Sequence, residues 1–311
     1  MIKKKKEVVI MSRWDRVRTE AGNNYLAVNT IDVNLPVANF IGSVWARLDG
    51  LGGATPVTAN LMGIRVRAQV IADGSKIIYD DTMRGGQQRV HYKFGVVPEL
   101  ATAGAGGATD MTLPIIFGRY LQDTEWILPA KLYKTLTLRL TFGVVLNANT
   151  DLYAATGADL EVNTDVCFDD LNPSTRKILK QTIIESHVNA AAAAVLLVDV
   201  PLQGQFLRSA HHMYTTATGA AAAIATDARV MINSGERIAW TGEFAATENF
   251  NVDPNTYAPN GVQIIDLDPA GDGRAGVDMR NLGKFQIELT EAAVAGTVVT
   301  VCEFLMNPHE V

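Results

Sequence analysis

Hydrophobic and polar residues alternate with a period of two along many segments of this chain, which is the pattern of half-buried β-strands. The alternating segments are 31–35, 64–70, 136–142 and 285–290, and a valine-rich segment over 297–304 predicts a final strand. Many strands separated by turn-forming residues are typical of a β-sandwich or a jelly roll.

Turns and helices complete this outline. Asp73 and Gly74 lie between two apolar segments, a pairing that indicates a β-hairpin. Helical patterns are few, and we expect short helices over 81–94 and 170–179. The second of these would begin near Pro173 and join two halves of the chain.

The second half of the chain repeats the first half in pattern. Four blocks recur in the same order: 35–43 as 200–209, 70–79 as 231–240, 113–116 as 262–265, and 138–141 as 287–290. The spacing changes only where loops or turns can differ in length, including one residue within the first block. We therefore interpret the chain as a duplicated all-β domain.

Length and composition agree with two domains. The 311 residues allow two units of roughly 150 residues each. Hydrophobic residues make up 48% of the chain and charged residues 19%, which is typical of a protein whose surface largely meets other subunits. A net charge of −6 argues against broad nucleic-acid binding, which needs a basic face.

Cysteine usage and apolar runs indicate neither an oxidising compartment nor a membrane span. Cys167 and Cys302 each lie near the end of a half, and we expect two buried thiols and no disulfide. The apolar segment 8–11 is too short for a secretory signal, and 190–198 is too short to cross a bilayer. A soluble protein, insoluble only through assembly, is expected.

Three stretches carry a resemblance to a known family. Segment 112–142, with Gly118, Arg119 and Asp123, resembles the end of the first jelly roll in capsid proteins of prokaryotic viruses. Segment 266–278 and the strands after it resemble the end of the second, and the hairpins at Gly74 and Gly235 fit inner strands. The chain thus resembles the double jelly-roll major capsid proteins of tailless icosahedral viruses with an internal membrane, the lineage of adenovirus hexon.

The resemblance implies an all-β fold of two tandem eight-stranded jelly rolls with few short helices. We expect a basic arm over 1–24, a first jelly roll over 25–170, a linker over 171–181 and a second jelly roll over 182–311. It implies homotrimers with a pseudo-hexagonal outline, located in the virion and made in the host cytoplasm. Partners would be neighbouring capsomers, penton and minor capsid proteins and an internal membrane, with no cofactor, enzyme activity or specific nucleic-acid recognition.

The start of the chain is basic and has two interpretations. Its cationic residues are Lys3, Lys4, Lys5, Lys6, Arg13, Arg16 and Arg18. A charged terminus can be a solvated tail. In the capsid interpretation it contacts anionic lipid, at about 1 kcal/mol per basic residue, or packaged genome.

A cluster of aspartates near the end of the chain has a similar ambiguity. Asp266, Asp268 and Asp272 lie around glycines, and oxygen-rich loops of this kind can bind calcium. Aspartate and glycine are also ordinary turn formers, and no helix pair or twelfth-position glutamate accompanies them. We expect no bound metal here, with calcium as the alternative.

The sequence contains no catalytic motif, and two other functions are alternatives to the capsid interpretation. A carbohydrate-binding or adhesin-like duplicated β-sandwich would need exposed aromatics and an export signal. A bicupin would need paired histidines with a carboxylate on inward positions. His211 and His212 are adjacent, so on a strand they point to opposite faces and do not share an ion. We therefore favour the structural capsid protein that the resemblance implies.

Overall fold

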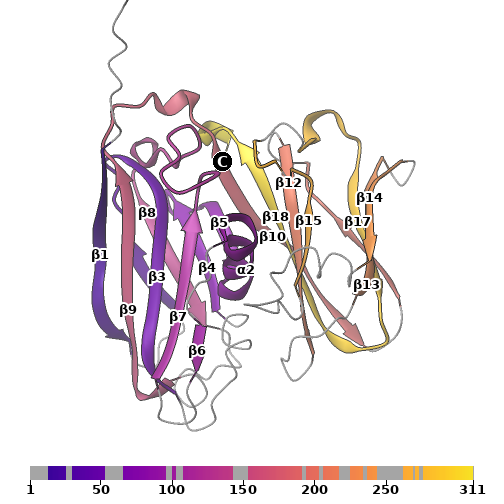
Figure 1. Ribbon diagram of the computed structural model, residues 1–311, viewed down its shortest axis with the longest axis horizontal. Coiled ribbons are helices and arrows are strands. Elements are labelled where there is room, and N and C mark those ends of the chain that lie inside the picture. Colours follow the sequence, from indigo (N-terminus) through magenta and orange to yellow (C-terminus); the bar gives the residue numbers. More distant parts are fainter. Residues whose placement is uncertain are drawn as a thin grey trace, which may run out of the picture.

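The computed structural model describes most of the chain. The described residues are 13–25, 30–52, 66–95, 100–102, 108–142, 153–190, 194–202, 206–216, 225–233, 237–243, 262–268, 270–272 and 276–310. They form two β-sandwich domains, and Figure 1 shows the C-terminal end in the upper middle of the view, where the two domains meet.

The first domain is built from two facing sheets. One has the strand order β1-β9-β3-β7-β6 and the other the order β2-β8-β4-β5. The strands are β1 (Trp14–Tyr25), β2 (Thr30–Asn34), β3 (Phe40–Gly52), β4 (Val66–Ala72), β5 (Lys76–Thr82), β6 (Leu100–Thr102), β7 (Ala108–Ile116), β8 (Leu136–Phe142) and β9 (Tyr153–Cys167). A helix, α2 (Met83–Phe94), follows β5, and a 3-10 turn, η1 (Ala130–Leu132), precedes β8.

The second domain has the same plan. One sheet has the order β10-β18-β12-β15, with β16 beside β12, and the other has the order β11-β17-β13-β14. The strands are β10 (Ile178–Ala190), β11 (Val195–Asp199), β12 (Phe206–Thr216), β13 (Ala225–Ile232), β14 (Arg237–Glu243), β15 (Val262–Asp266), β16 (Val277–Asp278), β17 (Phe285–Glu291) and β18 (Ala295–Met306). Three 3-10 turns, η2 (Pro173–Thr175), η3 (Met279–Asn281) and η4 (Pro308–Glu310), lie around it.

The strand order is that of a jelly roll in both domains. Apart from the short strands β6 and β16, the described part of each domain has eight strands in two antiparallel four-stranded sheets. All four sequence repeats fall on equivalent elements: the β2–β3 and β11–β12 connections, the β4–β5 and β13–β14 hairpins, β7 with β15, and β8 with β17. The predicted duplication and the double jelly-roll fold class are confirmed.

Alternation places the core between the two sheets of each domain. In β2, Ile31 and Val33 are buried while their polar neighbours are exposed. The apolar residues of β17 are buried as well, and so are those of β18 from Val301 to Met306. Burial of apolar area in this way is the main stabilising contribution to such sandwiches. Cys167 and Cys302 are buried and free, as predicted.

Three elements refine the expected boundaries. The helix expected over 81–94 is α2, which begins at the N-cap Thr82 and ends at Gly95 in the left-handed conformation. The helix expected over 170–179 is wrong: Asn172 caps the single turn η2, and β10 pairs with β18 from Ile178 onward. Within the expected basic arm, β1 pairs along β9 and belongs to the first sheet.

Replacing Gly86 by alanine tests how closely α2 packs on the first domain. A Cβ at Gly86 would meet Leu113 Cδ1 at 2.7 Å and the Tyr79 hydroxyl still more closely. Alanine in place of glycine normally stabilises a helix by about 1 kcal/mol. Here the added methyl group would overpack the contact with Tyr79 and Leu113. Alanine should therefore destabilise the protein and lower its free energy of unfolding by about 1–3 kcal/mol. Urea denaturation measures this, and a gain in stability would contradict the packing described.

Candidate functional site

The two jelly rolls meet through α2. This helix leaves the β5 edge of the first domain and lies against the outer face of the β10-β18-β12-β15 sheet of the second (Figure 1). The strand β5 itself runs beside β10. The first eight residues of α2, Met83 to Val90, are buried although half of them are arginine or glutamine. An interface of this composition must satisfy its polar groups internally.

A carboxylate at the centre of this interface collects cations from both domains. Glu303 on β18 is fully buried. It accepts hydrogen bonds from Lys93 Nζ at 2.6 Å and Arg89 Nη1 at 2.9 Å, both on α2. Arg208 Nη1, on β12, donates to it at 3.1 Å, and Gln181 Nε2 on β10 donates at 3.1 Å. Residues 89 and 93 reach the same carboxylate because they lie one helical turn apart.

The electrostatics of this cluster depend on the ionised carboxylate. Burial alone would raise the pKa of the Glu303 carboxyl, but Lys93, Arg89 and Arg208 together hold this pKa well below its ordinary value. A second buried carboxylate, Asp268, accepts from Arg208 Nε at 2.7 Å. The cations are therefore paired, which a buried charge requires.

Two further contacts fix α2 on the second domain. At the helix start, His211 Nε2 lies 3.1 Å from Asp81 Oδ2, and the Thr82 hydroxyl donates to Met213 Sδ at 3.0 Å. His212 instead lies 2.9 Å from the Thr300 hydroxyl on the neighbouring strand. The two adjacent histidines thus have different partners on different strands, as the alternation of a strand requires.

Trp126 adds an aromatic contact to the same interface. It belongs to the loop after β7 in the first domain and packs on Leu179 and Leu305 of the second. The Arg119 and Arg208 guanidinium groups lie 4.9 and 4.8 Å from its ring centroid. Cation–π contacts at this distance stabilise by about 0.5–2 kcal/mol each. This tryptophan is therefore a packing residue.

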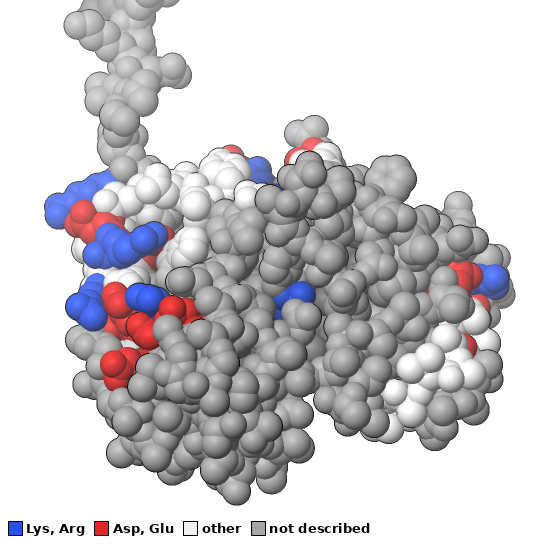
Figure 2. Space-filling view, turned by 60° about the horizontal axis from the view of Figure 1, so that its bottom comes forward, with Lys and Arg blue, Asp and Glu red and all other residues white. Residues whose placement is uncertain are grey.

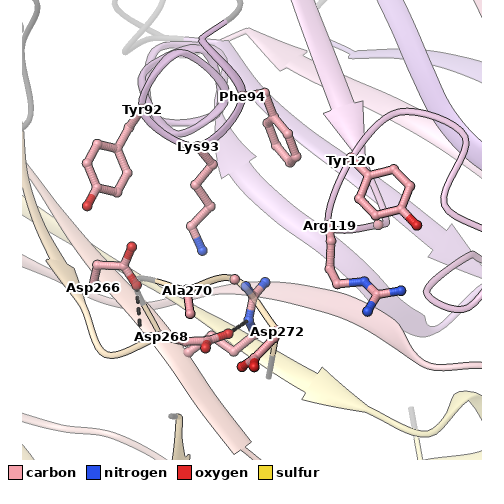
Figure 3. A pocket seen from close by; sticks show the side chains of 12 residues that line it. Tyr92, Lys93, Phe94, Arg119, Tyr120, Asp266, Asp268, Ala270 and Asp272 are labelled. Atoms are coloured by element: carbon pink, nitrogen blue, oxygen red, sulfur yellow. Dashed lines mark hydrogen bonds and ion pairs between the residues drawn. The ribbon is translucent and has the colours of Figure 1, made fainter. Parts of the chain in front are cut away.

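A cavity of about 500 Å³ opens beside the cluster. Figure 3 shows Tyr92 and Lys93 of α2 facing it, with the predicted aspartates Asp266, Asp268 and Asp272 on the opposite side. Asp268 is engaged by Arg208, and Asp266 Oδ1 accepts the Asp268 backbone N–H at 2.9 Å. Among the described residues, no group of three or more His, Cys, Asp or Glu side chains is arranged to bind a metal ion.

The outer face of the first domain carries a second set of charged residues. Figure 2 shows Lys/Arg and Asp/Glu side chains next to one another in one patch at the left of the view. Arg16 on β1 forms two hydrogen bonds with Asp165, at 2.7 and 3.0 Å. Asp165 also accepts from the Ser43 hydroxyl and from Trp45 Nε1. Arg18 Nε lies 3.6 Å from Glu161, on the same strand as Asp165.

The predicted basic residues therefore divide into two groups. Lys3, Lys4, Lys5 and Lys6 lie outside the described residues. Arg13 forms an ion pair with Asp15, and Arg16 and Arg18 are paired on the first sheet. For the part of the chain that is described, no helix is long and apolar enough to span a bilayer.

Sequence reasoning missed the buried charge cluster. Arg89 and Lys93 have the spacing of one helix face, and Glu303 interrupts the otherwise apolar strand β18. A single acidic residue inside an apolar run is the signal that could have indicated it. Its partners lie more than 90 residues away in the chain, so the pairing itself has no local pattern.

Comparison with known proteins identifies the fold. No protein-family model and no curated protein matches the sequence. The structure of the STIV major capsid protein matches with a TM-score of 0.72 and 15% identity, over 95% of this chain and 97% of that chain. The chain has the fold of viral major capsid proteins. The major capsid protein P2 of bacteriophage PM2 matches with a TM-score of 0.62 and 11% identity, over 96% of this chain and 100% of that chain.

The match to this capsid-protein fold spans both domains. A chain of the PBCV-1 virus capsid matches with a TM-score of 0.63 and 11% identity, over 96% of this chain and 95% of that chain. Identities this low leave the individual side chains unconstrained. The likeness therefore lies in the paired jelly rolls and their mutual placement.

Replacing Glu303 by glutamine tests the charge cluster. The neutral amide leaves three cations around it without their shared anion, so the free energy of unfolding at pH 7 should fall by about 3–5 kcal/mol. The folded-state pKa of Glu303 is below its ordinary value of 4.5. The stability that the ionised Glu303 contributes is therefore fully present above pH 4.5 and is lost as the pH falls from there through the folded-state pKa.

Denaturant unfolding of the wild type and Glu303→Gln from pH 7 to pH 3 measures both effects. The two stability curves should converge as the pH falls. Glu125→Gln is the matched control, because Glu125 also forms an ion pair, with Arg119, but its side chain is 67% exposed. Its effect should stay within about 0.5 kcal/mol. An equal loss in both variants would contradict the central role of Glu303.

Proposed function

We propose that this protein is a major capsid protein whose three-chain capsomers tile an icosahedral shell. The observation that carries the proposal is the double jelly-roll architecture, matched from end to end by capsid proteins of several viruses. Fold alone does not define a function. The matches nevertheless extend over the whole two-domain unit, with the first domain docked on the second, and this supports an assembly role.

The duplication supports the trimeric state. Two similar domains in each of three chains supply six similar wedges around one axis, and such a ring gives a pseudo-hexagonal outline. The domains already associate head to tail within the chain, because the α2 side of one contacts the outer sheet of the other. Head-to-tail contacts form closed rings when the rotation between units closes. Neighbouring capsomers, penton and minor capsid proteins would then be the partners in the virion.

The membrane-facing role proposed for the N-terminus rests on its charge. Arg13, the first described residue, is bound through its backbone N–H to Asp169 Oδ1 at 3.0 Å, close to the start of β1. The four lysines come at least seven residues earlier in the sequence. Basic residues next to an anionic lipid surface contribute about 1 kcal/mol each. Packaged genome is the competing anionic partner.

The mass of the purified protein in solution tests the capsomer. Light scattering should give a trimer of three 33.6 kDa chains, and electron microscopy should show six-lobed particles or closed shells. Each chain should bury more than about 2,000 Å² in the trimer, as obligate interfaces do, so the trimer should persist on dilution. A monomer that stays monomeric at high protein concentration would refute the proposal.

Vesicle flotation tests the membrane contact. The double variant Lys3→Ala/Lys4→Ala should bind phosphatidylserine-containing vesicles about 30-fold more weakly than the wild type, given about 1 kcal/mol per lysine. Lys76→Ala/Lys134→Ala removes the same charge from exposed positions of the first domain and should bind as the wild type does. Equal binding by all three proteins would exclude a lipid role for the lysines. Binding to nucleic acid instead would support packaged genome as their anionic partner.

A further inference from the structure

The internal duplication allows the edge strand β11 of the second domain to be compared with its counterpart β2 in the first. Among the described strands, β2 pairs only with β8, and β11 pairs only with β17. In register, Asp32 of β2 lies opposite Arg139. Leu197 of β11 lies opposite Glu288. These two partners are equivalent positions of the repeat, so Leu197 takes the place of Asp32.

The two edges differ in what they present to solvent. The exposed residues of β2 are polar, and Asp32 forms two 2.8 Å hydrogen bonds with Arg139. On β11 the equivalent positions hold Val195, which is 59% exposed, and Leu197, which is 48% exposed. Charged side chains on an edge strand hinder its pairing with another chain. The apolar positions of β11 lack this protection.

The backbone of β11 has one side turned outward. Ala194 accepts a hydrogen bond from β17 at 2.8 Å, and Val200 donates one to β17 at 3.0 Å. Alternate residues of an antiparallel strand bond to the same neighbour. The N–H and C=O groups of Val195 and Leu197 therefore point away from β17. The residues with the exposed apolar side chains are thus also the residues whose backbone faces the open edge.

The surroundings of this edge suit a second copy of the same surface. Figure 1 shows β13, β14 and β17, the other strands of this sheet, on the side of the second domain that faces away from the first. Asp199 lies 3.5 Å from Lys284 Nζ and accepts a hydrogen bond from Gln286 at 2.8 Å. Glu288 Oε1 lies 3.5 Å from Arg229 Nη1. Because these charges are neutralised within the domain, two such edges meet little electrostatic repulsion.

We propose that β11 pairs with β11 of a second copy of this chain across a two-fold axis, which joins two four-stranded sheets into one. The inference rests on the proposed function and names the contact through which neighbouring capsomers meet. A two-fold contact uses the same surface on both copies, as an antiparallel pair of identical strands does. The register that places Val195 opposite Leu197 of the second copy covers both apolar residues and leaves Asp199 outside the pair.

The strength of such a contact suits assembly. Main-chain hydrogen bonds give a strand addition its affinity, and the alternate side chains give it specificity. A pair of five-residue strands buries less than the roughly 1,200 Å² of a stable isolated interface. Single capsomers therefore stay separate when dilute. The same contact becomes strong when many copies act together over a shell.

Cysteine cross-linking tests the pairing and its register. Opposite residues of antiparallel strands lie within the Cα distance that a disulfide spans, about 4.4–6.8 Å. Oxidation of an equal mixture of Val195→Cys and Leu197→Cys should therefore give a disulfide-linked dimer on a non-reducing gel. The matched control is a mixture of Thr30→Cys and Asp32→Cys, at the equivalent positions of β2, which should give none. The two native cysteines are buried in all four variants.

Leu197→Lys tests the same contact without cysteine. Lysine on an edge strand blocks pairing, and opposite Glu288 it supplies an ion pair of the kind that Asp32 forms with Arg139. Sedimentation velocity over a concentration series should show wild-type capsomers associating with one another, and this association should be about tenfold weaker or less in the variant. Leu121→Lys, at a leucine 43% exposed in the loop after β7, should associate as the wild type does.

The outcomes separate this inference from the proposed function. Trimers that associate, with a cross-linked dimer formed in the β11 mixture alone, would support both. Trimers whose β11 mixture gives no more dimer than the β2 control would overturn the β11 contact and leave the capsid proposal standing. Circular dichroism checks the fold of Leu197→Lys, and if this variant is unfolded the cysteine mixtures decide. A chain that stays monomeric at every concentration would refute the capsid proposal, and the contact between capsomers with it.

Discussion

The placement of the two domains depends on one buried carboxylate. Glu303 lies on β18 and accepts hydrogen bonds from Arg89 and Lys93 of the first domain and from Arg208 of the second. A buried charge is tolerated only with partners in good geometry, so the two jelly rolls must keep one relative position for the pairing to hold. The cluster therefore constrains the shape of the two-domain unit.

The duplicated β-bulges show how two similar domains came to differ. The register between the third and last strands shifts at Gly42 in the first domain and at Arg208 in the second. At Gly42 a Cβ would lie 2.6 Å from the ring of Trp14, which therefore packs over the bulge. At Arg208 the same bulge places a guanidinium between Glu303 and Asp268. One backbone feature thus serves packing within a sheet in the first domain, and in the second domain it places Arg208 in the charge cluster on which the first domain docks.

The helix α2 contacts both domains. Its N-cap, Thr82, accepts the Gly85 N–H at 3.0 Å and also contacts the second domain through Met213. Almost all its early residues are buried, and its glycines allow the backbone to approach Tyr79 and Leu113 closely. A mostly polar helix is therefore stabilised here by tertiary contacts, since its own hydrophobic face is weak.

The sequence by itself determined the strands, the duplication and the fold class, because alternation with a period of two and Asp-Gly turns are local consequences of backbone geometry. It also indicated α2 and the free, buried cysteines. Only the tertiary structure decided that 14–25 joins the first sheet, that 170–179 is extended after one turn, and that Glu303 meets Arg89 and Lys93. These features depend on pairings between residues far apart in the chain, which leave no periodic pattern in the sequence. The tertiary fold alone brings such residues within hydrogen-bonding distance.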